Sequence, residues 1–71
     1  MKEWRVDFSI RYADGTIKEH YEVMLGETIG DVVNAANEKI KIPMERMNEI
    51  DDVAIWNIGI IAEAYDLEAV F

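Results

Sequence analysis

The sequence predicts a small protein of the α+β class, and three patterns indicate the order of its elements. Residues 4–12 alternate between apolar and polar side chains, as does the stretch after a tight-turn signal, which predicts two strands with one buried face each. Residues 29–40 place apolar side chains at helical spacing. Residues 53–61 are almost continuously apolar, which indicates a buried strand. We therefore expect one domain over residues 1–71: hairpin, helix, short helix, buried strand and short C-terminal strand.

The first element is a hairpin whose register follows from its turn. Asp14-Gly15 lies between the two alternating runs, and this dipeptide is a strong signal for a two-residue hairpin loop. Such a loop pairs Ala13 with Thr16 and puts the apolar side chains of both strands on one face. The expected apolar pairs are Tyr12 with Ile17, Phe8 with Tyr21, Val6 with Val23, and Trp4 with Leu25.

Two pairs in this predicted register fit poorly. Glu19 lies opposite Ile10 on the apolar face, and Arg11 lies opposite a second base, Lys18, on the polar face. We expect the hairpin tip to project beyond the core, which leaves Glu19 in water. His20, the only histidine, is expected on the polar face opposite Ser9 as an ordinary solvated side chain.

The third element is a helix that begins after Thr28. Thr28 and Asp31 have capping-box spacing. The side chains expected on the buried helix face are Ile29, Val32, Val33, Ala36 and Ile40. Pro43 is expected to end this helix and to occupy the first turn of a short second helix. The apolar side chains of that second helix are Met44, Met47 and Ile50.

Residues 53–61 are expected to form a central strand that is buried on both faces. Their length and branched side chains favour a strand, and Gly59 disfavours a helix. For residues 62–71 the pattern permits either a helical turn or an edge strand. We favour an extended strand through Tyr65, followed by a short final strand or turn.

One segment also has a distinctive order of residues. It reads Glu27-Thr28-Ile29-Gly30-Asp31-Val32-Val33 and continues to Glu38-Lys39-Ile40-Lys41-Ile42-Pro43. This order resembles the helix segment of the ubiquitin family. The resemblance implies a β-grasp-like ββαβ(β) arrangement, a small scaffold that often serves as a binding module. Conjugation and sulfur transfer are not expected, because those activities need a Gly-Gly ending and this chain ends Glu68-Ala69-Val70-Phe71.

The charge of the chain is acidic and uneven. Fifteen acidic and seven basic residues give a net charge of −8, and residues 47–71 contain six acids and no base. This balance disfavours nonspecific binding to nucleic acid and to anionic membranes. Because no apolar run approaches the ~20 residues of a membrane span and no apolar signal core follows Lys2, the expected location is the cytoplasm.

No pattern in the sequence indicates catalysis, a metal or a cofactor. The single histidine, His20, has no cysteine or serine partner pattern, so no catalytic triad is expected. The tight acidic cluster Glu49, Asp51 and Asp52 lacks the spacing of a calcium loop. We therefore predict that the protein is not an enzyme and holds no cofactor.

The predicted function is that of a protein-interaction module that binds a basic protein surface through its acidic C-terminal third. The expected contact residues are Glu49, Asp51, Asp52, Glu63, Tyr65, Asp66, Glu68 and Phe71. One alternative is a DNA-mimic inhibitor of a nucleic-acid-binding protein from a mobile element. Another is a homo-oligomer in which the C-terminal edge at Val70-Phe71 pairs across a two-fold axis.

Overall fold

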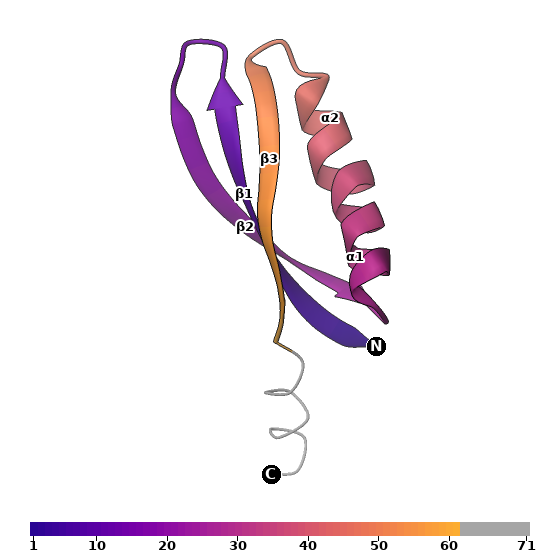
Figure 1. Ribbon diagram of the computed structural model, residues 1–71. Helices are drawn as coiled ribbons and strands as arrows, with labels where there is room; N and C mark the ends of the chain where they lie inside the picture. Colours follow the sequence, from indigo (N-terminus) through magenta and orange to yellow (C-terminus); the bar gives the residue numbers. More distant parts are fainter. Residues whose placement is uncertain (62–71) are drawn as a thin grey trace.

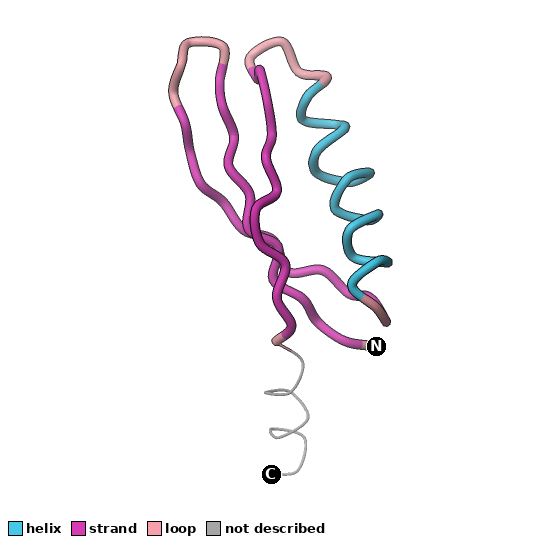
Figure 2. The backbone as a smooth tube through the Cα atoms, viewed as in Figure 1, coloured by secondary structure: helices cyan, strands magenta, loops and turns pink. Residues whose placement is uncertain are grey.

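A three-stranded antiparallel sheet with one helical segment on one of its faces makes up the fold (Figures 1 and 2). The computed structural model describes residues 1–61. Strands β2 and β3 flank β1 and run antiparallel to it. The elements are β1 (Lys2–Tyr12), β2 (Ile17–Gly26), α1 (Ile29–Ala36), the π-helical η1 (Asn37–Lys41), α2 (Ile42–Glu45) and β3 (Ile50–Ile60). The α+β class is confirmed, and the layout is compatible with a β-grasp-like arrangement.

Among the described residues the central strand is β1, and the prediction that residues 53–61 are buried on both faces is wrong. Within the described residues, β3 pairs with β1 alone and lies at an edge of the sheet. Val53 faces the core and is buried, whereas Trp56 is exposed. The prediction of burial on both faces failed because some of the apolar side chains in residues 53–61 point away from the helix. The predicted C-terminal strand lies outside the described residues.

The hairpin loop contains three residues instead of the predicted two. The amide of Gly15 donates to the carbonyl of Tyr12 at 2.9 Å, and the amide of Tyr12 donates to the carbonyl of Thr16 at 2.8 Å. Gly15 has a φ of 91°, a left-handed conformation that suits glycine and is typical of three-residue hairpin loops. The side chain of Asp14 accepts a hydrogen bond from the amide of Thr16 at 2.9 Å.

The additional loop residue shifts the pairing of β1 and β2 by one position. Phe8 lies opposite His20, and Trp4 lies opposite Met24. Because side chains alternate between faces, a shift of one residue moves every β2 side chain to the other face. The apolar side chains of β2 that are exposed as a result are Ile17, Tyr21, Val23 and Leu25. The prediction that they pack in the core is wrong.

The observed register removes the two poor pairs of the predicted one. Glu19 lies opposite Ser9 instead of Ile10. Arg11 and Lys18 no longer face each other, because Arg11 now pairs with Ile17. The hairpin therefore avoids a buried carboxylate and a like-charge pair, and its apolar row on β2 is exposed instead.

The helical segment begins as the sequence predicts. The hydroxyl of Thr28 accepts a hydrogen bond from the amide of Asp31, and the carboxylate of Asp31 accepts one from the amide of Thr28, both at 3.3 Å. This is the reciprocal capping box. Of the five side chains predicted for the buried face, Val32, Ala36 and Ile40 are buried and the other two are exposed.

Pro43 lies in the first turn of the short helix α2, as predicted, but it does not end the helical segment, contrary to the prediction. It follows the π-helical turn η1, where the amide of Ile42 donates to the carbonyl of Asn37, five residues back. Proline has no amide to donate, and its ring collides with the carbonyl four residues back in a regular α-helix. The π turn directly before Pro43 widens the helix there and leaves more room for the ring. The helix continues through α2, and Ile50 begins β3 instead of ending a second helix.

The core lies between the sheet and the helical segment. Its buried apolar side chains are Trp4, Val6, Phe8, Ile10, Val32, Ala36, Ile40, Ile50 and Val53. None of them comes from β2, whose contribution is the partly buried Met24. The core therefore depends on one face of β1. No helical segment within residues 1–61 has the length and apolar character of a membrane span.

The close approach of β2 to α1 occurs at Gly26. The indole Nε1 of Trp4 donates to the carbonyl of Gly26 at 2.9 Å. A Cβ atom at position 26 would lie 2.7 Å from Cγ2 of Val32, which is fully buried. Only glycine fits there without displacing the helix.

We expect Gly26→Ala to lower the free energy of unfolding by about 1–3 kcal/mol, because the added methyl group overpacks a rigid contact. Gly30→Ala is the matched control, since its nearest neighbour would be 3.7 Å away. It should leave stability unchanged or raise it by up to about 1 kcal/mol. Urea denaturation measures both variants, and equal effects would contradict this account of Gly26.

Candidate protein-binding surface

The face of the sheet turned away from the helix exposes a group of apolar side chains. We define the outer-face patch as Ile17, Tyr21, Val23, Leu25 and Trp56. Their exposed fractions range from 48% to 64%, and within residues 1–61 the helical segment lies on the opposite side of the sheet (Figure 1). Exposed apolar patches are typical of protein-interaction sites.

A polar cluster fixes the centre of this face. Nε of Arg5 donates to Oδ1 of Asp7 at 3.0 Å, and Nδ2 of Asn57 donates to Oδ2 of Asp7 at 2.9 Å. The guanidinium carbon of Arg5 lies 4.3 Å from the ring centroid of Tyr21, within cation–π range. The hydrogen bond from Asn57, supported by Arg5, holds the pKa of Asp7 below its ordinary value.

Trp56 reaches this face through an irregularity in β3. The pairing of β1 with β3 shifts between Asp7 and Phe8, and Trp56 has no partner there. Such bulges redirect side chains. A shallow hollow of about 250 Å³ has Tyr21 and Trp56 among its lining residues, with Arg5 and Asp7. Aromatic rings around a charged pair can hold an inserted side chain, since aromatic and arginine anchors are typical of binding hot spots.

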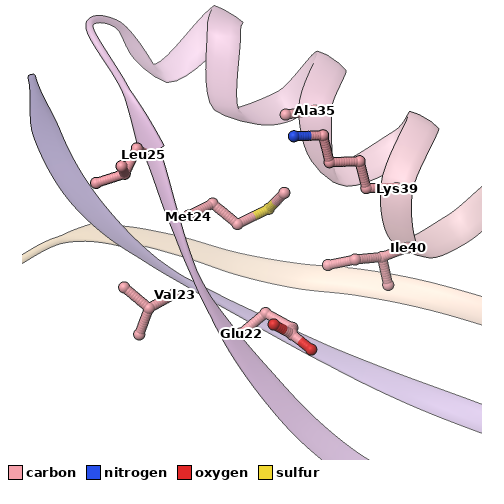
Figure 3. Close-up of a pocket in the computed structure, with 7 residues that line it drawn as sticks. All are labelled: Glu22, Val23, Met24, Leu25, Ala35, Lys39 and Ile40. Atoms are coloured by element: carbon pink, nitrogen blue, oxygen red, sulfur yellow. The ribbon is translucent and has the colours of Figure 1, made fainter.

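A second hollow, of about 400 Å³, lies between β2 and the helical segment. Figure 3 shows that Met24 points toward the helix, whereas Val23 and Leu25 point away from it. Glu22 of β2 and Lys39 of η1 also line it. The hollow therefore combines an apolar floor with both signs of charge.

The helix also covers part of the free edge of β3. Nζ of Lys41 donates to the carbonyl of Val53 at 2.6 Å and to Glu45 at 3.0 Å, and the amide of Val53 donates to Glu45 at 3.2 Å. This arrangement satisfies backbone groups that an edge strand leaves open. The hydrogen bonds from Lys41 and Val53 hold the pKa of Glu45 below its ordinary value.

The structure divides the acidic cluster that the sequence singles out. Glu49 and Asp51 are exposed, whereas Asp52 is half-buried with its carboxylate 3.9 Å from Nζ of Lys41. Among the described residues, no group of three or more acidic or histidine side chains could hold a metal ion. The other predicted contact residues, which lie outside the described residues, are Glu63, Tyr65, Asp66, Glu68 and Phe71.

His20 lies on a different face from the predicted one. It is exposed at the side of the sheet that carries the helix, opposite Phe8 instead of Ser9. Its ring stacks on that of Phe8, with 6.0 Å between the centroids. This contact gives His20 a packing role at the margin of the core.

The sequence-based interpretation missed the outer-face patch because it assigned the side chains of β2 to the core. The signal that could have revealed the patch was present. The poor pairing of Glu19 with Ile10 and of Arg11 with Lys18 disappears in the register that exposes Tyr21 and its neighbours.

Comparison of the chain with protein-family models, with curated proteins and with solved structures gives no significant match. The function must therefore be argued from the chemistry of the surface.

The carboxylates of Asp7 and Glu45 make the stability of the fold depend on pH. Their folded-state pKa values are lowered, so the unfolded chain binds more protons in acid and stability falls as the pH drops below about 5. Asp7→Asn still accepts a hydrogen bond but does not ionise. We expect its free energy of unfolding to fall less than that of the wild type between about pH 5 and pH 3.

Asp51→Asn is the control, because Asp51 is exposed and has no hydrogen-bond partner among residues 1–61. It should keep the wild-type pH dependence. Denaturant titrations at several pH values measure the difference, and a wild-type slope in Asp7→Asn would contradict the assignment.

Proposed function

We propose that this chain is a non-enzymatic protein-interaction module that binds its partner through the outer-face patch. One observation carries the proposal: the apolar row of β2, with Trp56 beside Tyr21, is exposed on a rigid sheet. Removing such side chains from water contributes roughly 25 cal/mol per Å² of apolar surface. A sheet face needs little reorganisation to bind, because its backbone is already held by β1.

The proposed partner has a basic surface around its apolar contact. The net charge is −8, and no base occurs in residues 47–71. Opposite charges accelerate encounter and select between partners more than they raise affinity. Glu49, immediately before β3, and Asp51, within β3, are exposed and are suited to this role. The acidic residues beyond position 61 remain proposed contacts on the basis of their sequence.

The resemblance of residues 27–43 to the helix segment of the ubiquitin family also supports a role in protein interaction. The scaffold that this resemblance implies often serves as a binding module. Its role here rests on the surface chemistry of β2 and β3, since a fold alone does not determine a function.

Affinity capture from a lysate of the source organism tests the proposal, with Tyr21→Ala and Trp56→Ala as variants. We expect each variant to retain about tenfold less of the partner than the wild type, because aromatic anchors carry much of the binding energy. Capture should also slow as the salt concentration rises from about 0.05 to about 0.5 M.

Ile42→Ala is the matched control. It also truncates an exposed apolar side chain, but on the helical segment and away from the sheet. It should retain the partner as the wild type does. Equal retention by all three variants, or a partner that is captured equally fast at both salt concentrations, would count against the proposal.

A further inference from the structure

The two edges of the sheet differ in how they are covered. The edge of β3 is capped at Val53 by Lys41 and Glu45. Along residues 17–23 of β2, no described element lies beside the free edge (Figure 1). The amide of Tyr12 bonds to Thr16, and the bonds of an antiparallel ladder alternate. The odd-numbered residues of β2 therefore direct their amides and carbonyls to that free edge.

We propose that two copies of this chain pair antiparallel through their β2 edges, around a two-fold axis at His20. The two sheets would then form one six-stranded sheet with both helical segments on the same side. The unpaired backbone groups of the edge would bond to those of the second copy, as edge strands do when they find a partner.

The charged side chains of β2 favour this register over the other registers in which two β2 strands could pair. With the axis at His20, Lys18 of each copy lies opposite Glu22 of the other copy. The dimer therefore contains two equivalent pairs of opposite charge. An axis at Glu19 or at Glu22 would instead bring two glutamates face to face, which is unfavourable between paired strands.

An axis at Tyr21 avoids like-charge pairs but leaves Lys18 without an acidic residue opposite it. It would place Lys18 opposite Met24 and Glu19 opposite Val23, so that neither charge meets an opposite one. The axis at His20 also pairs Ile17 with Val23 of the second copy on the outer face. The apolar rows of both copies would become one wider surface.

This inference is independent of the proposed function, because it rests on the backbone edge and on charges at the helix side of the sheet. Loss of self-pairing would leave the outer-face patch intact, and loss of partner binding would leave the edge intact. The two can therefore fail separately.

Sedimentation velocity over a wide range of concentrations tests the pairing. The wild type should shift from a monomer of 8.2 kDa to a dimer of twice that mass as its concentration rises. Lys18→Glu and Glu22→Lys should each raise the dissociation constant about tenfold or more, because both symmetric pairs become like-charged. The double variant K18E/E22K should restore it.

Arg46→Glu is the matched control for Lys18→Glu. It makes the same change in net charge at an exposed residue after α2, and it should pair as the wild type does. A monomer at every concentration would overturn the proposal. So would single variants that pair normally, or a double variant that stays monomeric.

Disulfide formation gives a second readout of the register, since the chain has no cysteine. In this pairing, position 20 lies opposite itself, at about the 4.5 Å Cα separation of a non-hydrogen-bonded pair, which suits a disulfide. We expect His20→Cys to form a linked dimer readily on mild oxidation. Lys18→Cys alone should not form a linked dimer. A mixture of Lys18→Cys and Glu22→Cys should form a dimer in which one copy of each variant is linked to the other. Equal rates for every cysteine variant would contradict the register.

Discussion

The three-residue turn Ala13–Gly15 is the constraint on which the rest of the structure depends. Gly15 adopts a left-handed conformation with a φ of 91°, and the loop it closes pairs Tyr12 with Thr16. Because side chains alternate along a strand, this pairing decides which face of β2 meets the helix. Met24 consequently points toward the helix, whereas Val23 and Leu25 point away from it (Figure 3), and Tyr21 is exposed.

Because of this turn, the two strands of the hairpin have different roles in the structure. β1 is central and supplies four of the buried core side chains, while β2 is attached mainly through its backbone ladder and through the contact of Gly26 with α1. The thin core of so small a chain is built without the apolar row of β2. That row, with Trp56 and the cluster around Asp7, remains available for contact with another protein.

Sequence patterns correctly predicted those features that depend on interactions between residues close together in the chain. The capping box at Thr28, the alternation along β1 and the α+β class depend on neighbouring residues, and each is confirmed. The register of β2 was not accessible in the same way, because Asp14-Gly15 suits a two-residue loop and also the three-residue loop that forms. The position of β3 depends on how the chain crosses the sheet, which local hydropathy does not encode. Pro43 was misread because a π turn can accommodate a proline.

The register of the hairpin can be measured by nuclear Overhauser contacts between the α-protons of β1 and β2. Opposed residues of a non-hydrogen-bonded pair have the closest Cα atoms of the ladder, at about 4.5 Å. The observed register predicts a strong contact between the α-protons of Asp7 and Tyr21, which lie opposite each other. A strong contact between those of Phe8 and Tyr21 would instead show a two-residue loop, and it would place the outer-face patch in the core.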